Sequence, residues 1–311
     1  MNKPLNIAHR GGANLWPENT LEAFSNAIDL GVDAIEFDIQ ATKDDRLIIH
    51  HDDRLKPDAT RANGAWLTPP TPRLRHLTHT ELKALDIGRL QPDSAYARTR
   101  VGQTPIDGAQ IPDFAAMNQL VAARTGEDFR LYAELKTNLL DDTPDEAAHL
   151  AALFCTELQA SPVLDRTHII SFNWVSIDTV RRKFPDLPYA YTTIPFDVSD
   201  PDHASAAQDP PDSLRARLRA ASAAGAKWWA GHDWRNETGA THGEKMLAAI
   251  ARAGIRHWFG FHKDITPETM RCAARLNLQV TAWTANTPDE IARLANLGVH
   301  GIVTDRPDLM Q

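Results

Sequence analysis

The stretch AIEFDIQATKDDRLIIHHD, residues 34–52, decides how the rest of the chain is interpreted. Two apolar runs, Ala34–Ile39 and Leu47–His50, flank a polar link at residues 40–46. The link is too short to contain the helix that connects two parallel strands. Its Lys-Asp-Asp-Arg centre is typical of a turn. We therefore expect an antiparallel β-hairpin at this point.

The hairpin also suggests a register for its two strands. Pairing Thr42 with Leu47 and counting outward places His51 opposite Asp38. Successive side chains on a strand point to opposite faces, so His50 and His51 cannot both face the same site. This register selects His51 as the residue beside Asp38 and leaves His50 for packing or the surface.

Outside the hairpin, short β-type runs alternate with helical patterns along the chain. Strands are expected at Leu5–His9, Leu131–Leu135, His168–Phe172, Tyr189–Thr193, Lys227–Gly231, Val280–Trp283 and Gly301–Thr304. Helices are expected at Thr20–Leu30, Phe114–Ala123, Pro144–Leu158, Val175–Phe184, Ser213–Ala224, Glu244–Ala253, Pro267–Leu276 and Pro288–Leu297. With the first hairpin strand this makes eight parallel strands, which favours an α/β fold of the (β/α)8 TIM-barrel type.

Two segments interrupt the alternation. Residues 52–112 contain seven prolines and no sustained period, so we expect an insertion directly after the hairpin. It would cap the barrel mouth and shape the pocket. Residues 195–212 are expected to form a mobile surface loop. Because no domain-scale linker is present, residues 1–311 are predicted to form a single domain, and the helix after the last strand should be short or missing.

Composition limits the possible partners and compartments. The net charge of -8 argues against a nucleic-acid partner, because neutralising phosphates needs a basic surface. No run approaches the roughly 20 apolar residues of a membrane helix, so no stable membrane association is expected. Cys155 and Cys272 fit no metal-type spacing and are expected to be buried free thiols. The N-terminus lacks a signal-peptide pattern, which favours the cytoplasm, or the periplasm or exterior if a leader was removed.

Carboxylates at two strand positions indicate a metal site. Glu36 and Asp38 are two residues apart on one strand and share a face, and Glu134 and Lys136 do the same on the next parallel strand. Three converging carboxylates repel one another unless a hard divalent cation such as Ca2+ or Mg2+ lies between them. The alternative is that Glu36 and Asp38 are solvated at a strand end.

Two histidines, two cations and a tryptophan complete the candidate site. His9 ends the first strand, where it could transfer protons, and Arg10 could grip a phosphate with two donors. A purely structural histidine is the alternative for His9. Trp283, at another strand end, could form an apolar wall or be an ordinary core residue. Zinc is disfavoured because the first strand lacks two imidazoles on one face.

Ordered motifs along nearly the whole chain resemble the glycerophosphodiester phosphodiesterase family. They are His9-Arg10-Gly11, Pro17-Glu18-Asn19-Thr20, Glu36-Phe37-Asp38, Thr42-Lys43-Asp44, His51-Asp52, Glu134-Leu135-Lys136, Ser171-Phe172, Trp283-Thr284-Ala285-Asn286 and Gly301 to Pro307. The resemblance implies a (β/α)8 barrel with an insertion after the hairpin. It also implies metal-dependent hydrolysis of small glycerophosphodiesters to glycerol 3-phosphate and an alcohol.

The resemblance assigns roles residue by residue. It implies that Glu36, Asp38 and Glu134 bind one divalent cation, Ca2+ or Mg2+. His9 and His51 would be the acid–base pair, and Arg10 and Lys136 would contact phosphate. The nucleophile would be the neighbouring glycerol hydroxyl, giving a cyclic phosphate that water then opens.

Two other functions remain open. A lysophospholipase D would share the site but need an exposed apolar rim, for which Trp228, Trp229, Trp258 and Phe259 are candidates, although packing beneath helices is the alternative for them. A non-catalytic phosphodiester-binding protein should lose one of the two histidines, and this chain keeps both. Asn173, His300 and residues 55–61 depart from the commonest family pattern, which leaves the identity of the substrate's alcohol open. The sequence does not fix the oligomeric state.

Overall fold

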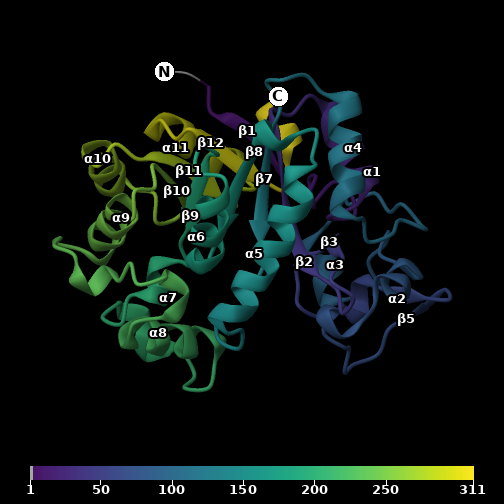
Figure 1. The fold of residues 1–311 in the computed structure, drawn as a ribbon, viewed down its shortest axis with the longest axis horizontal. Helices are drawn as coiled ribbons and strands as arrows, with labels where there is room; N and C mark the ends of the chain where they lie inside the picture. The colour runs from purple at the N-terminus through teal and green to yellow at the C-terminus, as the bar shows by residue number, and fades with distance from the viewer. Residues whose placement is uncertain (1–2) are drawn as a thin grey trace. The chain divides into compact units, whose positions relative to one another are not determined.

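Eight parallel strands form the closed barrel that the sequence predicts (Figure 1). The computed structural model describes residues 3–311. Each strand is hydrogen-bonded to the next, and the last returns to the first. The strands are β1 (Leu5–His9), β2 (Ala34–Ala41), β7 (Arg130–Leu135), β8 (Thr167–Ser171), β9 (Tyr189–Thr192), β10 (His257–Phe261), β11 (Gln279–Trp283) and β12 (Gly301–Thr304). The predicted hairpin is also present, because β3 (Leu47–Ile49) pairs with β2 in antiparallel orientation.

Helices follow most of the barrel strands, close to their expected positions. They are α1 (Leu21–Leu30), α4 (Phe114–Arg124), α5 (Pro144–Gln159), α6 (Trp174–Lys183), α8 (Leu214–Ala224), α9 (His242–Arg252), α10 (Pro267–Arg275) and α11 (Pro288–Leu297). Threonine side chains cap several N-termini, as Thr287 does by accepting a hydrogen bond from Glu290 N. Only the short 3-10 helix η7 (Pro307–Met310) follows β12, as expected.

One strand was assigned to the wrong segment. Residues 227–231 are not a strand: η5 (Lys227–Trp229) is a 3-10 helix, and Ala230 and Gly231 have φ angles of 51° and 84°. A left-handed backbone cannot continue a β-strand. The missing strand is β10, which pairs in parallel with β9 and β11. A glycine inside its short HWFGF run weakens the strand pattern.

Residue contacts divide the chain into two compact units. The first unit consists of Leu5–Lys136, Leu150–His168 and Val303–Gln311, and the second chiefly of Thr137–His149 and Ile169–Ile302. The single-domain organisation therefore stays a prediction. None of the helices within residues 3–311 is long and apolar enough to cross a membrane.

Phe37 shows which way β2 faces in the first unit. Its buried ring lies 6.1 Å from the ring of Phe24 on α1 and 6.1 Å from that of Phe114 on α4. Phe114 continues the cluster to Phe154 on α5. Because strand side chains alternate, packing Phe37 beneath the helices turns its neighbours Glu36 and Asp38 to the barrel interior.

The insertion contains more structure than the sequence suggested. It has a small sheet in the order β5 (Ala65–Trp66), β4 (Arg61–Ala62), β6 (Leu85–Asp86), with the helices η1 (Pro57–Ala59), η2 (Leu74–His76), α2 (His79–Lys83) and α3 (Ala95–Thr99). Its apolar cluster comprises Ile48 of β3 together with Leu55, Leu74, Leu82, Ile87 and Ile111. Elements of two to five residues are too short to produce a period in the sequence.

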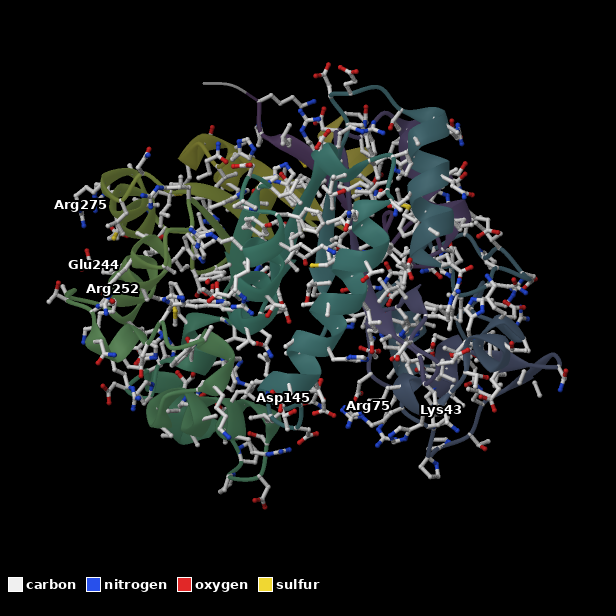
Figure 2. The ribbon with its side chains drawn as sticks, viewed as in Figure 1. Lys43, Arg75, Asp145, Glu244, Arg252 and Arg275 are labelled. Atoms are coloured by element: carbon white, nitrogen blue, oxygen red, sulfur yellow. The ribbon has the colours of Figure 1, made fainter. Side chains whose placement is uncertain are left out.

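The second unit also differs from expectation at residues 195–212. This segment is not a plain loop, because it contains α7 (Phe196–Ser199) and η4 (Ala204–Gln208). Val198 and Ser199 are buried. Charged side chains lie on the outer faces of the helices, as where Glu244 on α9 pairs with Arg275 on α10 (Figure 2). The thiols of Cys155 and Cys272 are both buried, as expected.

Asp264, after β10, provides a test of the packing in the second unit. Burial raises the pKa of its carboxyl to about 7, and nearby Asp197 adds to the rise although the Phe196 amide opposes it by donating a hydrogen bond. The ordinary pKa applies in the unfolded chain, so that state loses its proton first as the pH rises from about 4 to 7. Asp264 therefore lowers the free energy of unfolding progressively over this range.

We expect Asp264→Asn to raise the free energy of unfolding by about 1–3 kcal/mol at pH 8 and by less at pH 5. The asparagine oxygen can still accept the Phe196 hydrogen bond, but it carries no charge. Urea denaturation at both pH values measures the difference. Asp212→Asn, at an exposed position, is the control and should change little at either pH. An equal gain for Asp264→Asn at both pH values would contradict the assignment.

Candidate active site

Three buried carboxylates meet at the end of β2 and β7 in the first unit. Glu36 and Asp38 are 2% and 0% exposed, and Glu134 is also buried. The parallel register places Asp38 beside Glu134. One oxygen of each of the three carboxylates lies within 4.8 Å of the other two. The structure therefore brings together the three residues that the sequence analysis placed around a cation.

Cations and an amide surround Asp38. Arg10 Nε lies 3.2 Å from Asp38 Oδ2, which also accepts a hydrogen bond of 2.8 Å from Asn19 Nδ2. Lys136 Nζ lies 2.8 Å from Glu134 Oε1 and 3.7 Å from Asp38 Oδ1. Burial acts to raise the pKa of Asp38, but His51, Arg10 and Lys136 hold it well below its usual range. Asp38 is therefore ionised at neutral pH.

The pKa of Glu36 is shifted in the opposite direction, upward. Burial, followed by the negative charges of Asp38 and Glu134, raises its pKa well above the usual value. Burial also raises the pKa of Glu134, despite nearby Lys136. The two side-chain cations thus leave part of the carboxylate repulsion uncompensated, which is the condition that a bound divalent cation relieves.

The donor set fits a hard divalent cation. All three groups offer oxygen, which Ca2+ and Mg2+ prefer. Asp38 Oδ1 is buried and accepts no hydrogen bond, so a lone pair is available beside Glu36 and Glu134. Within residues 3–311, these three side chains form the only cluster of histidine, cysteine and acidic groups with metal-binding spacing.

His9 lies beside the carboxylates at the end of β1. Its Nε2 is 3.8 Å from Glu36 Oε2, and its Nδ1 is 2.5 Å from Asp305 Oδ1. Asp305 directly follows β12, which is the barrel neighbour of β1. Burial acts to raise the pKa of Asp305, but His9 and Arg100 keep it well below the usual range. The imidazole is therefore held by an ionised carboxylate through Nδ1.

The hairpin register differs from the expected one by one residue. Ile39 pairs with Ile49, and His50 N donates a hydrogen bond to Asp38 O, so His50 and not His51 lies opposite Asp38. The expectation was wrong because Leu47 pairs with Ala41 and not with Thr42, which belongs to the turn and donates a backbone hydrogen bond to Arg46 O.

His51 nevertheless interacts electrostatically with Asp38 of the carboxylate cluster. Burial and the positive charges of Arg10 and Lys136 lower its pKa to about 4, while Asp38 acts in the opposite direction. His51 Nδ1 lies 2.6 Å from Asp52 Oδ1. His50 has a different environment, in which its Nδ1 lies 3.1 Å from the carbonyl oxygen of Asp52. The two imidazoles therefore have different partners, the backbone carbonyl of Asp52 for His50 and the Asp52 carboxylate for His51.

Arg10 is fixed by acidic groups on two sides. The residue is buried and has a φ of 53°, and its backbone N donates a hydrogen bond of 2.8 Å to Glu36 O. Its Nη1 donates a hydrogen bond of 3.0 Å to Glu18 Oε1. Although burial acts to lower the pKa of Arg10, Glu18 and Asp38 raise it well above its usual value. The guanidinium therefore stays charged beside the carboxylates, with its orientation set by Glu18.

Trp283 lies in the second unit, at the end of β11. Its ring centroid is 5.3 Å from that of Phe172 and 5.2 Å from that of Phe261, and its Nε1 donates a hydrogen bond to Phe259 O. The side chain is partly exposed. An aromatic wall is consistent with these contacts, and its role toward substrate stays a prediction.

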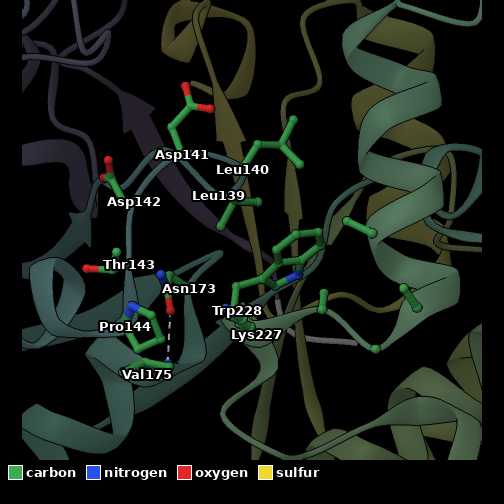
Figure 3. A pocket seen from close by; sticks show the side chains of 14 residues that line it. Leu139, Leu140, Asp141, Asp142, Thr143, Pro144, Asn173, Val175, Lys227 and Trp228 are labelled. Atoms are coloured by element: carbon green, nitrogen blue, oxygen red, sulfur yellow. Dashed lines mark hydrogen bonds between the residues drawn. The ribbon is translucent and has the colours of Figure 1, made fainter.

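The four aromatic residues considered for an acyl-binding rim are all buried. Trp228, Trp229, Trp258 and Phe259 are each at most 4% exposed. A cavity of about 400 Å³ does occur in the second unit (Figure 3). It is lined by apolar side chains such as Leu140 and Trp228 and by the amide of Asn173, whose oxygen accepts a hydrogen bond from Val175 N.

Several residues around the site were not assigned from the sequence. Glu18, Asp52 and Asp305 occur in the quoted motifs without a role. Asp305 could have been placed, because barrel closure brings the end of the last strand to the first. The other group, Lys56, Tyr96 and Arg100, comes from the insertion, where no pattern indicated which residues turn toward the site.

The comparisons confirm the resemblance seen in the motifs. The model of the glycerophosphoryl diester phosphodiesterase family matches residues 9–309. A glycerophosphodiester phosphodiesterase from Caldanaerobacter subterraneus is 25% identical over 308 residues, covering 99% of this chain and 96% of the relative.

Solved structures agree with this. A chain from Silicibacter pomeroyi, assigned as a glycerophosphoryl diester phosphodiesterase, is 30% identical with a TM-score of 0.81, and the match covers 100% of this chain and 93% of that one. An Oleispira antarctica phosphodiesterase solved with sn-glycerol-3-phosphate has the same fold, at 18% identity, a TM-score of 0.67 and coverage of 99% and 96%. The chain therefore belongs to the glycerophosphoryl diester phosphodiesterase family.

Proposed function

We propose that this enzyme hydrolyses small glycerophosphodiesters to glycerol 3-phosphate and an alcohol, with one divalent cation and two histidines. The observation that carries the proposal is the convergence of Glu36, Asp38 and Glu134 beside two imidazoles that are each paired with a carboxylate. The product in the Oleispira antarctica structure, sn-glycerol-3-phosphate, supports the same reaction.

Glu36, Asp38 and Glu134 would hold the cation, Ca2+ or Mg2+. When bound, it supplies positive charge to the non-bridging oxygens of the phosphate. Arg10 and Lys136 contribute further positive charge beside Asp38, where each cation lies near a different carboxylate oxygen. Fixed cations of this kind stabilise charge that grows in the transition state.

His9 and His51 would divide the proton transfers. With its pKa lowered to about 4, His51 is neutral near pH 7 and can accept a proton from the attacking hydroxyl. His9 has Nδ1 occupied by Asp305, which leaves Nε2 on the side of Glu36 to protonate the departing alcohol. The attacking group is a neighbouring glycerol hydroxyl, and water then opens the cyclic phosphate.

Lysophospholipids are less favoured as substrates. The aromatic residues that could have formed an exposed rim for an acyl chain are packed in the interior. Among residues 3–311, the large apolar side chains with high exposure are Val101 and Leu214. Both histidines are present beside the carboxylates, which favours catalysis over passive phosphodiester binding.

Removal of the cation should abolish activity. We expect EDTA to inactivate the enzyme against glycerophosphocholine, and Ca2+ or Mg2+ to restore it. Glu134→Gln should weaken metal binding measured by calorimetry, because one anionic ligand is lost. Glu146→Gln, at a partly exposed position in the first turn of α5, is the matched control and should bind metal normally. Full turnover in the chelated enzyme would refute the metal-dependent mechanism.

The two histidines should behave alike, and differently from His50. We expect His9→Ala and His51→Ala each to lower kcat by about 10²–10⁴, because each removes a proton-transfer group. His50→Ala should retain most of its activity, since its Nδ1 contacts the backbone carbonyl oxygen of Asp52 and not a carboxylate. Steady-state kinetics of the three variants test this, with circular dichroism to check folding. An inactive His50→Ala beside an active His51→Ala would reverse the assignment.

A further inference from the structure

We propose that the insertion at residues 52–112 positions both catalytic histidines, through one cation for each imidazole–carboxylate pair. The two relays are His9–Asp305–Arg100 and His51–Asp52–Lys56. The inference deepens the proposed function and rests on its two-histidine mechanism. All six side chains lie in the first unit.

The first relay joins three distant parts of the chain. His9 Nδ1 lies 2.5 Å from Asp305 Oδ1, and Arg100 Nη1 donates a hydrogen bond of 2.8 Å to Asp305 Oδ2. Arg100 Nη1 also contacts Asn14 Oδ1 at 3.0 Å, which fixes the guanidinium over the loop after β1. One carboxylate oxygen of Asp305 thus contacts the imidazole of His9, and the other contacts Arg100 of the insertion.

The second relay repeats this arrangement within six consecutive residues, 51–56. His51 Nδ1 lies 2.6 Å from Asp52 Oδ1, and Lys56 Nζ lies 2.8 Å from Asp52 Oδ2. Lys56 Nζ is also 4.1 Å from the centre of the Tyr96 ring. Burial acts to lower the pKa of Lys56, but Glu18, Tyr96 and Asp52 raise it, so the ammonium stays charged.

Glu18 connects the two relays. Its carboxylate lies 3.6 Å from Lys56 Nζ and 3.7 Å from Arg100 Nη2, and it accepts a hydrogen bond from the Tyr96 hydroxyl. The same carboxylate contacts Arg10, the proposed phosphate ligand. One half-buried acid therefore links both insertion cations to Arg10.

The physical role of each cation follows from the geometry of its carboxylate. A carboxylate on Nδ1 fixes the imidazole tautomer and leaves Nε2 for proton transfer. It does so only while it is ionised and cannot rotate. A cation on the second oxygen secures both conditions. Arg100 and Lys56 are therefore positioning residues that act through Asp305 and Asp52.

A merely structural role for these cations would attach the insertion to the barrel without affecting catalysis. The two possibilities differ in what kinetics would show. A positioning role lowers kcat, leaves KM nearly unchanged and requires the intervening carboxylate. A structural role lowers the melting temperature and gives effects that add to those of the carboxylate variants.

The test measures kcat, KM and melting temperature for Arg100→Met and Lys56→Met in the metal-loaded enzyme with glycerophosphocholine. We expect kcat to fall about 10–100-fold in each, as for other groups that orient a catalytic ligand, with KM within about 3-fold. Arg89→Met is the matched control, because Arg89 forms a two-hydrogen-bond pair with Asp107 in the same insertion but reaches neither histidine. Its kcat should equal that of the parent enzyme.

Double-mutant cycles then ask whether each cation acts through its carboxylate. Once Asp305→Asn is present, adding Arg100→Met should cost little more, and Lys56→Met should likewise cost little in Asp52→Asn. Arg100→Lys and Lys56→Arg keep the positive charge and should recover part of kcat. These two variants also test the proposal if a methionine variant does not fold.

Two outcomes would overturn the proposal, and they are distinguishable. If His9→Ala and His51→Ala are inactive while Arg100→Met and Lys56→Met match Arg89→Met, the acid–base pair stands and the positioning role is wrong. Fully additive losses in both cycles would lead to the same conclusion. If the histidine variants themselves remain active, the proposed mechanism fails, and with it this inference.

Discussion

Repulsion among three buried carboxylates is the constraint around which the first unit is organised. Glu36, Asp38 and Glu134 approach one another where little water reaches them, and each gains energy from a compensating positive charge. Arg10 and Lys136 supply part of that charge. The repulsion that remains among the three carboxylates would favour the binding of a divalent cation, which in turn could attract a phosphate.

The same constraint accounts for the two acids that contact the histidines, Asp52 and Asp305. Burial and the positive charges of Arg10 and Lys136 lower the pKa of His51 and keep its imidazole neutral. Asp52 opposes this effect through its hydrogen bond to the His51 ring, and Asp305 contacts the ring of His9. Acids and bases thus alternate outward from the carboxylate cluster, and such pairing is the usual condition for burying ionised groups.

Much of this arrangement could be predicted from the sequence, because it depends on local rules. Same-face spacing placed Glu36 beside Asp38, and barrel topology placed Glu134 opposite them. The rules failed where a strand ended or changed conformation. His51 reaches the cluster by a turn after Ile49 and not by the expected register, and the backbone at Ala230 and Gly231 ruled out a strand that composition favoured. The contacts of Lys56 and Arg100 could not be predicted, because elements of a few residues leave no periodic signal.

The pairing of His9 with Asp305 has a consequence for how the enzyme is made. Nearly three hundred residues separate the two side chains along the chain, and both are needed at one position. During synthesis, the N-terminal histidine leaves the ribosome long before its carboxylate partner exists. A nascent chain in which Glu36, Asp38 and Glu134 have already met still lacks the carboxylate that orients the His9 imidazole. Under the proposed mechanism, hydrolysis therefore begins only when β12 joins β1, and phosphodiester cleavage would report that the barrel has closed.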